Sequence, residues 1–181
     1  PMFAFVPALL LSASLPFAHA GTLAGVTLPD SASVGGQPVV LNGLGLREKY
    51  FMDIYVGGLY LPTKTKDANK AINDDVAKRI VMHFTYELAK EKLGGIMLES
   101  LSDSGSPAAR EHAAELAGWM TSVAPGDEIM LDYAPGTGTS VIVRGTTKGT
   151  IAGPEFMKAI FGVYLGPKPP TKELKAGMLG G

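Results

Sequence analysis

Residues 41–61 read LNGLGLREKYFMDIYVGGLYL, and this stretch is the most informative part of the chain about its fold. Two apolar runs, rich in β-branched and aromatic residues, flank the charged tripeptide Arg47-Glu48-Lys49. The pattern predicts a β-hairpin with strands at residues 37–46 and 50–61 and with the tripeptide at its tip. Gly57 and Gly58 lie inside the second strand and indicate a bulge or a close approach of another backbone.

The rest of the chain carries further strand and helix signals, in groups. Strands are predicted at residues 25–28, 78–85, 128–133, 140–144 and 147–151, with residues 134–139 (APGTGT) as a hairpin loop. Helices are predicted at residues 67–73, 88–101, 107–121, 154–165 and 171–178. Strands and helices do not alternate as in βαβ units, so the expected fold class is α+β with an antiparallel sheet.

The first twenty residues, PMFAFVPALLLSASLPFAHA, contain no Lys, Arg, Asp or Glu and end in a small-x-small motif. This pattern predicts a signal peptide, residues 1–20, whose cleavage leaves residues 21–181 as a single domain. An uncleaved membrane anchor is the alternative. No basic segment precedes the apolar run and the chain begins at Pro1, so we expect its true beginning to lie upstream. The prediction implies an exported bacterial protein, periplasmic or secreted.

Composition excludes several functional classes. The 181 residues include 16 basic and 17 acidic side chains, so the chain lacks the excess of positive charge that nucleic-acid binding needs. The absence of cysteine excludes disulfide scaffolds, Cys-ligated zinc and thiol catalysis. With 46% hydrophobic residues, the chain is not disordered as a whole.

Motifs for metal and cofactor binding are weak. His83 and His112 lack the spacing of a ligand pair, so we expect structural or solvent-facing roles and neither a metal nor a cofactor. The two Gly-x-Gly motifs, at residues 43–45 and 136–138, are interpreted as turns and not as phosphate loops. Trp119 is expected to be an anchor in the core or at its rim.

Arg47 is the strongest candidate for chemistry. It precedes an aromatic strand that contains Tyr55, and a guanidinium with five donors suits a carboxylate that a tyrosine hydroxyl can share. At the mouth of an apolar cavity, such a pair would hold an acidic head group. The alternative is a surface arginine paired with Glu48 or Asp53.

The run NGLGLREKYFMDIYVGGLYL, followed by KRIVMHF and later by GTIAGPEFMKAIFGVYLGPKP, resembles the chalcone isomerase-like family, specifically its exported bacterial branch. The resemblance covers residues 26–179. It implies an open-faced β-sandwich, in which helices cover one side of a large antiparallel sheet. Plant enzymes of this family close the flavanone ring with an arginine, a cleft tyrosine, an asparagine and a hydroxyl. Other members bind fatty acids through the arginine and a nearby tyrosine.

The resemblance assigns Arg47 to the family arginine and Tyr55 to the tyrosine of the fatty-acid-binding branch. The other polar groups of the enzymes fall at or near three aliphatic residues: Ala89, Ile96 and Ala159. Tyr86 is a candidate to reach inward as a substitute. An isomerase needs oriented donors for the charge that develops in its transition state, and these replacements remove most of them.

The resulting hypothesis is a non-catalytic protein that binds a fatty acid or similar amphipathic carboxylate through Arg47 and Tyr55. It predicts no nucleic-acid partner and no stable membrane insertion after signal cleavage, and it leaves any protein partner unknown. Two alternatives remain: an isomerase acting on a chalcone-like enone, with Arg47 as its catalytic residue, and an envelope interaction module without a small ligand.

Overall fold

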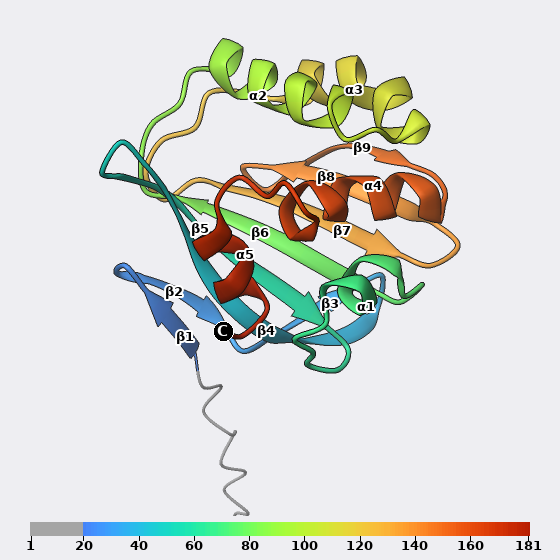
Figure 1. The fold of residues 1–181 in the computed structure, drawn as a ribbon, viewed down its shortest axis with the longest axis horizontal. Helices are drawn as coiled ribbons and strands as arrows, with labels where there is room; N and C mark the ends of the chain where they lie inside the picture. The colour runs from blue at the N-terminus through green and yellow to red at the C-terminus, as the bar shows by residue number, and fades with distance from the viewer. Residues whose placement is uncertain (1–19) are drawn as a thin grey trace, which may run out of the picture.

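The computed structural model describes residues 20–181 (Figure 1). The predicted signal peptide therefore lies, apart from Ala20, outside the described residues. Within residues 20–181, none of the helices combines the length and the apolar character that crossing a bilayer requires.

A curled antiparallel sheet of seven strands forms the centre of the molecule, and each strand pairs with the next one in the chain (Figure 1). Its strands are β3 (Ser31–Val34), β4 (Gln37–Lys49), β5 (Met52–Leu61), β6 (Lys78–Phe84), β7 (Glu128–Ala134), β8 (Gly138–Val143) and β9 (Thr146–Ile151). A separate hairpin of β1 (Ala20–Leu23) and β2 (Val26–Pro29) precedes it. The predictions missed β1 and β3: the first adjoins the predicted cleavage site, and the second is a short SASV segment without a strand-like apolar pattern.

All five predicted helices are present, with ends that differ from the predictions by at most two residues. They are α1 (Ala68–Asn73), α2 (Lys90–Ser102), α3 (Pro107–Trp119), α4 (Pro154–Leu165) and α5 (Lys172–Met178). Side-chain oxygens cap three of their N-termini, from Asp67, Ser106 and Thr171. Buried residues of all five helices join one large core on a single face of the sheet. The expected α+β open-faced sandwich is confirmed.

The alternation of side chains along β6 separates the two faces of the sheet. Ile80, Met82 and Phe84 join the core beneath the helices, whereas Val81 joins a smaller core on the opposite face, with residues of the β1–β2 hairpin. Farther along that second face, polar cross-strand contacts replace apolar ones: an ion pair between Arg79 and Asp132, and a hydrogen bond between His83 Nδ1 and Glu128 Oε1 at 2.9 Å. His83 thus has the structural role expected of it.

The predicted hairpin tip at Arg47-Glu48-Lys49 is wrong. Strand pairing continues to Lys49 opposite Met52, and the turn is Tyr50-Phe51, with φ angles of 52° and 62°. Two successive left-handed residues make a type I′ turn, for which Asn-Gly is the usual signal. Two aromatic residues give no such signal, so the charged tripeptide was mistaken for the turn.

The prediction of a turn at residues 43–45 is also wrong, because these residues lie in the middle of β4. A Cβ atom on Gly43 would clash with the backbone of Gly177, and one on Gly45 with the backbone of Leu174, both in α5. Gly57 on β5 has Leu174 and Met178 directly above it. These glycines permit α5 to lie directly on the sheet. The second motif, at residues 136–138, does form the β7–β8 turn.

Candidate functional site

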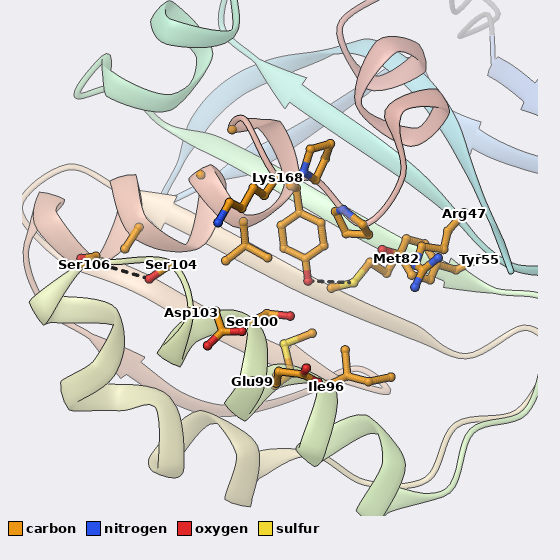
Figure 2. Close-up of a pocket in the computed structure, with 18 of the residues that line it drawn as sticks. Arg47, Tyr55, Met82, Ile96, Glu99, Ser100, Asp103, Ser104, Ser106 and Lys168 are labelled. Atoms are coloured by element: carbon orange, nitrogen blue, oxygen red, sulfur yellow. Dashed lines mark hydrogen bonds between the residues drawn. The ribbon is translucent and has the colours of Figure 1, made fainter.

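A cavity of about 780 Å³ lies between the sheet, α2, α4 and the segment that leads into α5 (Figure 2). This volume is within the range of roughly 300–1,000 Å³ that is usual for small-molecule sites. Its apolar lining comes from both the sheet and the helices: Ile54, Phe84 and Met82 from the strands, Leu93, Ile96 and Met97 from α2, and Ala159 and Val163 from α4.

Arg47 and Tyr55 lie together at one end of this cavity (Figure 2). They are directly opposed on neighbouring strands, so both side chains leave the same face of the sheet. The half-buried Arg47 donates one hydrogen bond, from Nη1 to the backbone carbonyl of Glu48 at 3.2 Å. Within residues 20–181 it forms no ion pair, so the alternative of a pair with Glu48 or Asp53 is wrong. The guanidinium retains donors for an anion.

Tyr55 is only 7% exposed, and its ring packs on Phe84 with 5.5 Å between the ring centroids. Its hydroxyl has no hydrogen bond to any of the described residues. Burial raises the pKa of Tyr55 well above its usual value of 10, and the nearby Arg47 offsets only part of that rise. The phenol therefore stays protonated and can donate a hydrogen bond beside the arginine.

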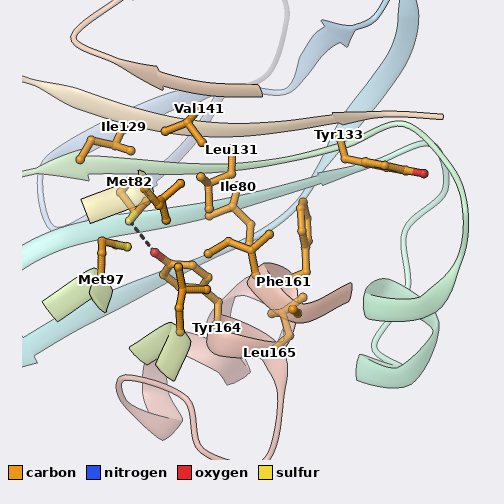
Figure 3. Close-up of a cluster of buried hydrophobic side chains, with 14 of the residues drawn as sticks. Ile80, Met82, Met97, Ile129, Leu131, Tyr133, Val141, Phe161, Tyr164 and Leu165 are labelled. Carbon is orange, nitrogen blue, oxygen red and sulfur yellow. Dashed lines mark hydrogen bonds between the residues drawn. The ribbon is translucent and has the colours of Figure 1, made fainter. Parts of the chain in front are cut away.

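Tyr164 of α4 supplies a third polar group in the cavity wall, which the predicted helix over residues 154–165 did not single out. Its hydroxyl donates to Met82 Sδ at 3.3 Å (Figure 3), and a thioether is a weak acceptor. Burial raises the pKa of this hydroxyl as well, so it too remains a donor. A tyrosine on an apolar helix face is itself a signal, because a buried hydroxyl needs a partner.

The three aliphatic residues expected in place of the enzymes' polar groups divide into two groups. Ile96 and Ala159 line the cavity, whereas Ala89 precedes α2 and lies outside the lining. The suggestion that Tyr86 reaches inward is wrong: its side chain is 39% exposed and does not line the cavity. The backbone N–H of Tyr86 donates to the carbonyl of Ile54 at 3.3 Å, close to the hairpin tip, and the residue is partly exposed there.

The far end of the cavity is polar. Ser104 and Ser106 lie there, linked by a 3.3 Å hydrogen bond from the Ser106 N–H to Ser104 Oγ, with Asp103 close by (Figure 2). The exposed Lys168 also lines the cavity. The site therefore has a cation and a phenol at one end and a hydrophilic rim at the other. The middle between them is largely apolar, with Glu99 and Ser100 of α2 at its edge (Figure 2). This arrangement fits a molecule with an acidic head and an apolar tail.

Other polar groups that the sequence or burial singles out have structural roles. His112 pairs with Glu115 at 3.0 Å, and Trp119 packs at the rim of the core over Gly149. Residues 20–181 contain no cluster of three potential metal-ligating side chains. The fully buried Lys78 donates from Nζ to the carbonyls of Ala71 and Ile72, and burial lowers its pKa to about 8.

The curled meander with helices on one face, and one cavity bounded by a strand-borne arginine, define the class of fold. The chain belongs to the chalcone isomerase-like family, whose model matches residues 20–180. A search of curated protein sequences finds no match. Among solved structures, the chain is similar to the crystal structure of a fatty-acid binding protein of Arabidopsis thaliana, with a TM-score of 0.73 and 18% identity. The similarity covers 89% of this chain and 96% of the plant chain, and at this identity it establishes the fold alone.

Proposed function

We propose that this protein binds a fatty acid or a similar amphipathic carboxylate in the cavity and does not transform it. Arg47 and the Tyr55 hydroxyl hold the carboxylate, and the apolar middle holds the acyl chain. The single observation that carries the proposal is the half-buried Arg47 guanidinium, which has no ion pair among the described residues and opens onto an apolar cavity of about 780 Å³. The fatty-acid binding protein of the same fold supports it.

Charge and burial both favour such a ligand. A hydrogen bond between a charged donor and a carboxylate contributes about 1.5–3 kcal/mol, and each buried methylene adds about 0.8 kcal/mol. Because Arg47 and Tyr55 are adjacent, one carboxylate can accept from both. Ile96 and Ala159 offer no further donors beside the ligand, and the Tyr164 hydroxyl already donates to Met82 Sδ. The site therefore favours binding an anion over stabilising charge that develops during a reaction.

Ligand extraction gives the first test of the proposed function. We expect mass spectrometry of solvent extracts from the purified protein to detect acyl carboxylates, and calorimetry with added laurate to show one binding site. Absence of acyl species together with absence of laurate binding would contradict the proposal.

A matched pair of arginine variants locates the site. R47Q should weaken laurate binding by roughly ten- to hundredfold, because it removes a charged donor, while the melting temperature stays close to that of the wild type. R110Q removes the same charge from an exposed position on α3 outside the cavity lining and should leave the affinity unchanged. Equal affinities for both variants would place the carboxylate elsewhere.

We further propose that the protein is exported, to a bacterial periplasm or to the medium, after removal of residues 1–20. The support is the uncharged apolar run that ends in Ala18-His19-Ala20. N-terminal sequencing of the protein from its native host should begin at Gly21. A retained N-terminal segment in a cytoplasmic fraction would contradict this proposal.

A further inference from the structure

Exposed apolar side chains are concentrated at one end of the molecule. Among residues 20–181, the exposed large hydrophobic residues are Tyr50 at 79%, Phe51 at 98%, Met52 at 38%, Tyr86 at 39% and Leu98 at 43%. The first three form the tip of the β4–β5 hairpin, and the N–H of Tyr86 is bonded to the carbonyl of Ile54, two residues beyond Met52. Leu98 alone lies away from this group, on α2.

The backbone conformation of the tip is unfavourable for large side chains. Tyr50 and Phe51 both have positive φ angles, a conformation that suits glycine or asparagine far better than a large side chain. Neither side chain gains compensating burial within the described fold, since Phe51 is almost fully exposed. Folding therefore does not account for two aromatic residues at this turn.

The tip adjoins the Arg47 end of the cavity. Arg47 and Lys49, on the strand that leads into the turn, both line the cavity, and Lys49 is exposed. The Lys49 ammonium lies 5.4 Å from the centroid of the Tyr50 ring. A tyrosine and a phenylalanine beside a lysine are the side chains typical of a membrane–water interface.

We propose that this hairpin tip, Tyr50-Phe51-Met52, docks onto a lipid bilayer and holds the Arg47 end of the cavity at the membrane surface. The docking stands on the tip itself; the consequence that a fatty acid enters the cavity directly from the bilayer rests on the proposed function. Charge near the tip is balanced, with Arg47 and Lys49 against Glu48 and Asp53. Binding therefore depends on aromatic burial in the interface and little on anionic lipid.

The absence of cysteine permits a direct test on the full chain. A cysteine placed by E48C, next to the tip, carries an environment-sensitive fluorophore. T137C carries the same label in the β7–β8 turn, at the opposite end of the antiparallel strands. Both proteins are mixed with phosphatidylcholine vesicles, with or without phosphatidylglycerol.

We expect a blue shift of the E48C emission with both kinds of vesicle and no shift for T137C. The double substitution Y50N/F51G, in the E48C background, should weaken vesicle partitioning by roughly ten- to hundredfold, since it removes two aromatic anchors. Asn-Gly suits a type I′ turn, so this variant should fold and melt no lower than the parent. L98S serves as the matched control, because it removes an exposed apolar side chain away from the tip and should partition as the parent does.

Three results would overturn the docking proposal: no shift at position 48, an equal shift at position 137, or a shift that survives Y50N/F51G. The last would assign membrane binding to another segment, such as the apolar N-terminus. The proposed function fails separately. In vesicle-free buffer, the laurate affinity of Y50N/F51G should equal that of the wild type. If the wild type does not bind laurate at all, the proposed function fails but the docking result stands.

Discussion

The same face of strands β4 and β5 has two halves that behave in opposite ways. In one half, Gly43, Gly45 and Gly57 present no side chains, and α5 lies directly on the backbone. In the other half, Arg47 and Tyr55 project from the same two strands, and the space above them is a cavity. Only two residues along each strand separate the seat of a helix from a ligand site.

Residue size at alternate positions explains this difference. Where the strands carry glycine, the side chains of Leu174 and Met178 fill the space above the sheet, and both are completely buried. Where the strands carry large polar residues, no helix can approach as closely. The chain instead passes through Pro169 and Pro170, which line the cavity, before α5 begins. The glycines thus set one boundary of the cavity.

The largest effect on stability is expected from a substitution at the glycines beneath α5. G45A places a Cβ atom against the backbone of Leu174, which cannot move without displacing α5. We expect a loss of about 2–4 kcal/mol in the free energy of unfolding, measured by urea denaturation.

The matched control for G45A is the same substitution at an open helical position. Gly95 of α2 is exposed, with nothing within 4 Å of an added Cβ, so G95A should stabilise the protein by about 0.5–1 kcal/mol. Equal effects of the two substitutions would show that α5 does not depend on the glycines.

A smaller effect, on laurate affinity, is expected from a substitution at Tyr55. Y55F removes the hydroxyl but keeps the ring contact with Phe84, so the fold should tolerate it. We expect laurate affinity to fall by about fivefold, equivalent to about 1 kcal/mol for one hydrogen bond. Y86F changes an exposed tyrosine outside the cavity and is the control. An unchanged affinity of Y55F would remove Tyr55 from the site.

A series of fatty acids of increasing chain length tests whether the acyl chain occupies the apolar middle of the cavity, beyond Arg47. Each added methylene should improve affinity by about 0.8 kcal/mol, close to fourfold, until the chain reaches the polar rim near Ser104 and Ser106. Beyond that length the gain should cease. Calorimetry over a series of saturated acids measures the slope, and affinity independent of length would exclude the middle of the cavity as the site of the tail.

The smallest effect is expected from pH. Because burial holds the pKa of Tyr55 above its usual 10, its hydroxyl keeps its proton in the folded protein. Laurate affinity should thus change little between about pH 6 and about pH 10, above the carboxylate range. A loss of affinity centred below pH 10 in the wild type, absent from Y55F, would show that the phenol is not protected as the structure indicates.

Much of the fold followed from local patterns. The strand predicted at residues 78–85 and the helix predicted at residues 171–178 are both present, as β6 and α5. The hairpin between β4 and β5 was predicted, but its turn was misplaced by three residues, because turn type depends on backbone angles that Tyr50 and Phe51 do not signal. The candidate site was only partly predictable. Tyr164 of α4 lies in the cavity wall although it is more than a hundred residues from Arg47 and Tyr55 in the sequence.

Local pattern was enough to indicate an antiparallel α+β fold, because alternation and caps are properties of short segments. Arg47 was singled out by the family resemblance of its surrounding sequence. Tertiary structure alone revealed that Gly43 and Gly45 support a helix, that Arg47 lies opposite Tyr55, and that an aromatic turn adjoins the Arg47 end of the cavity. Register and helix docking depend on which surfaces distant segments bury against one another. That choice is made by the packing of the whole chain and is not encoded in any single stretch.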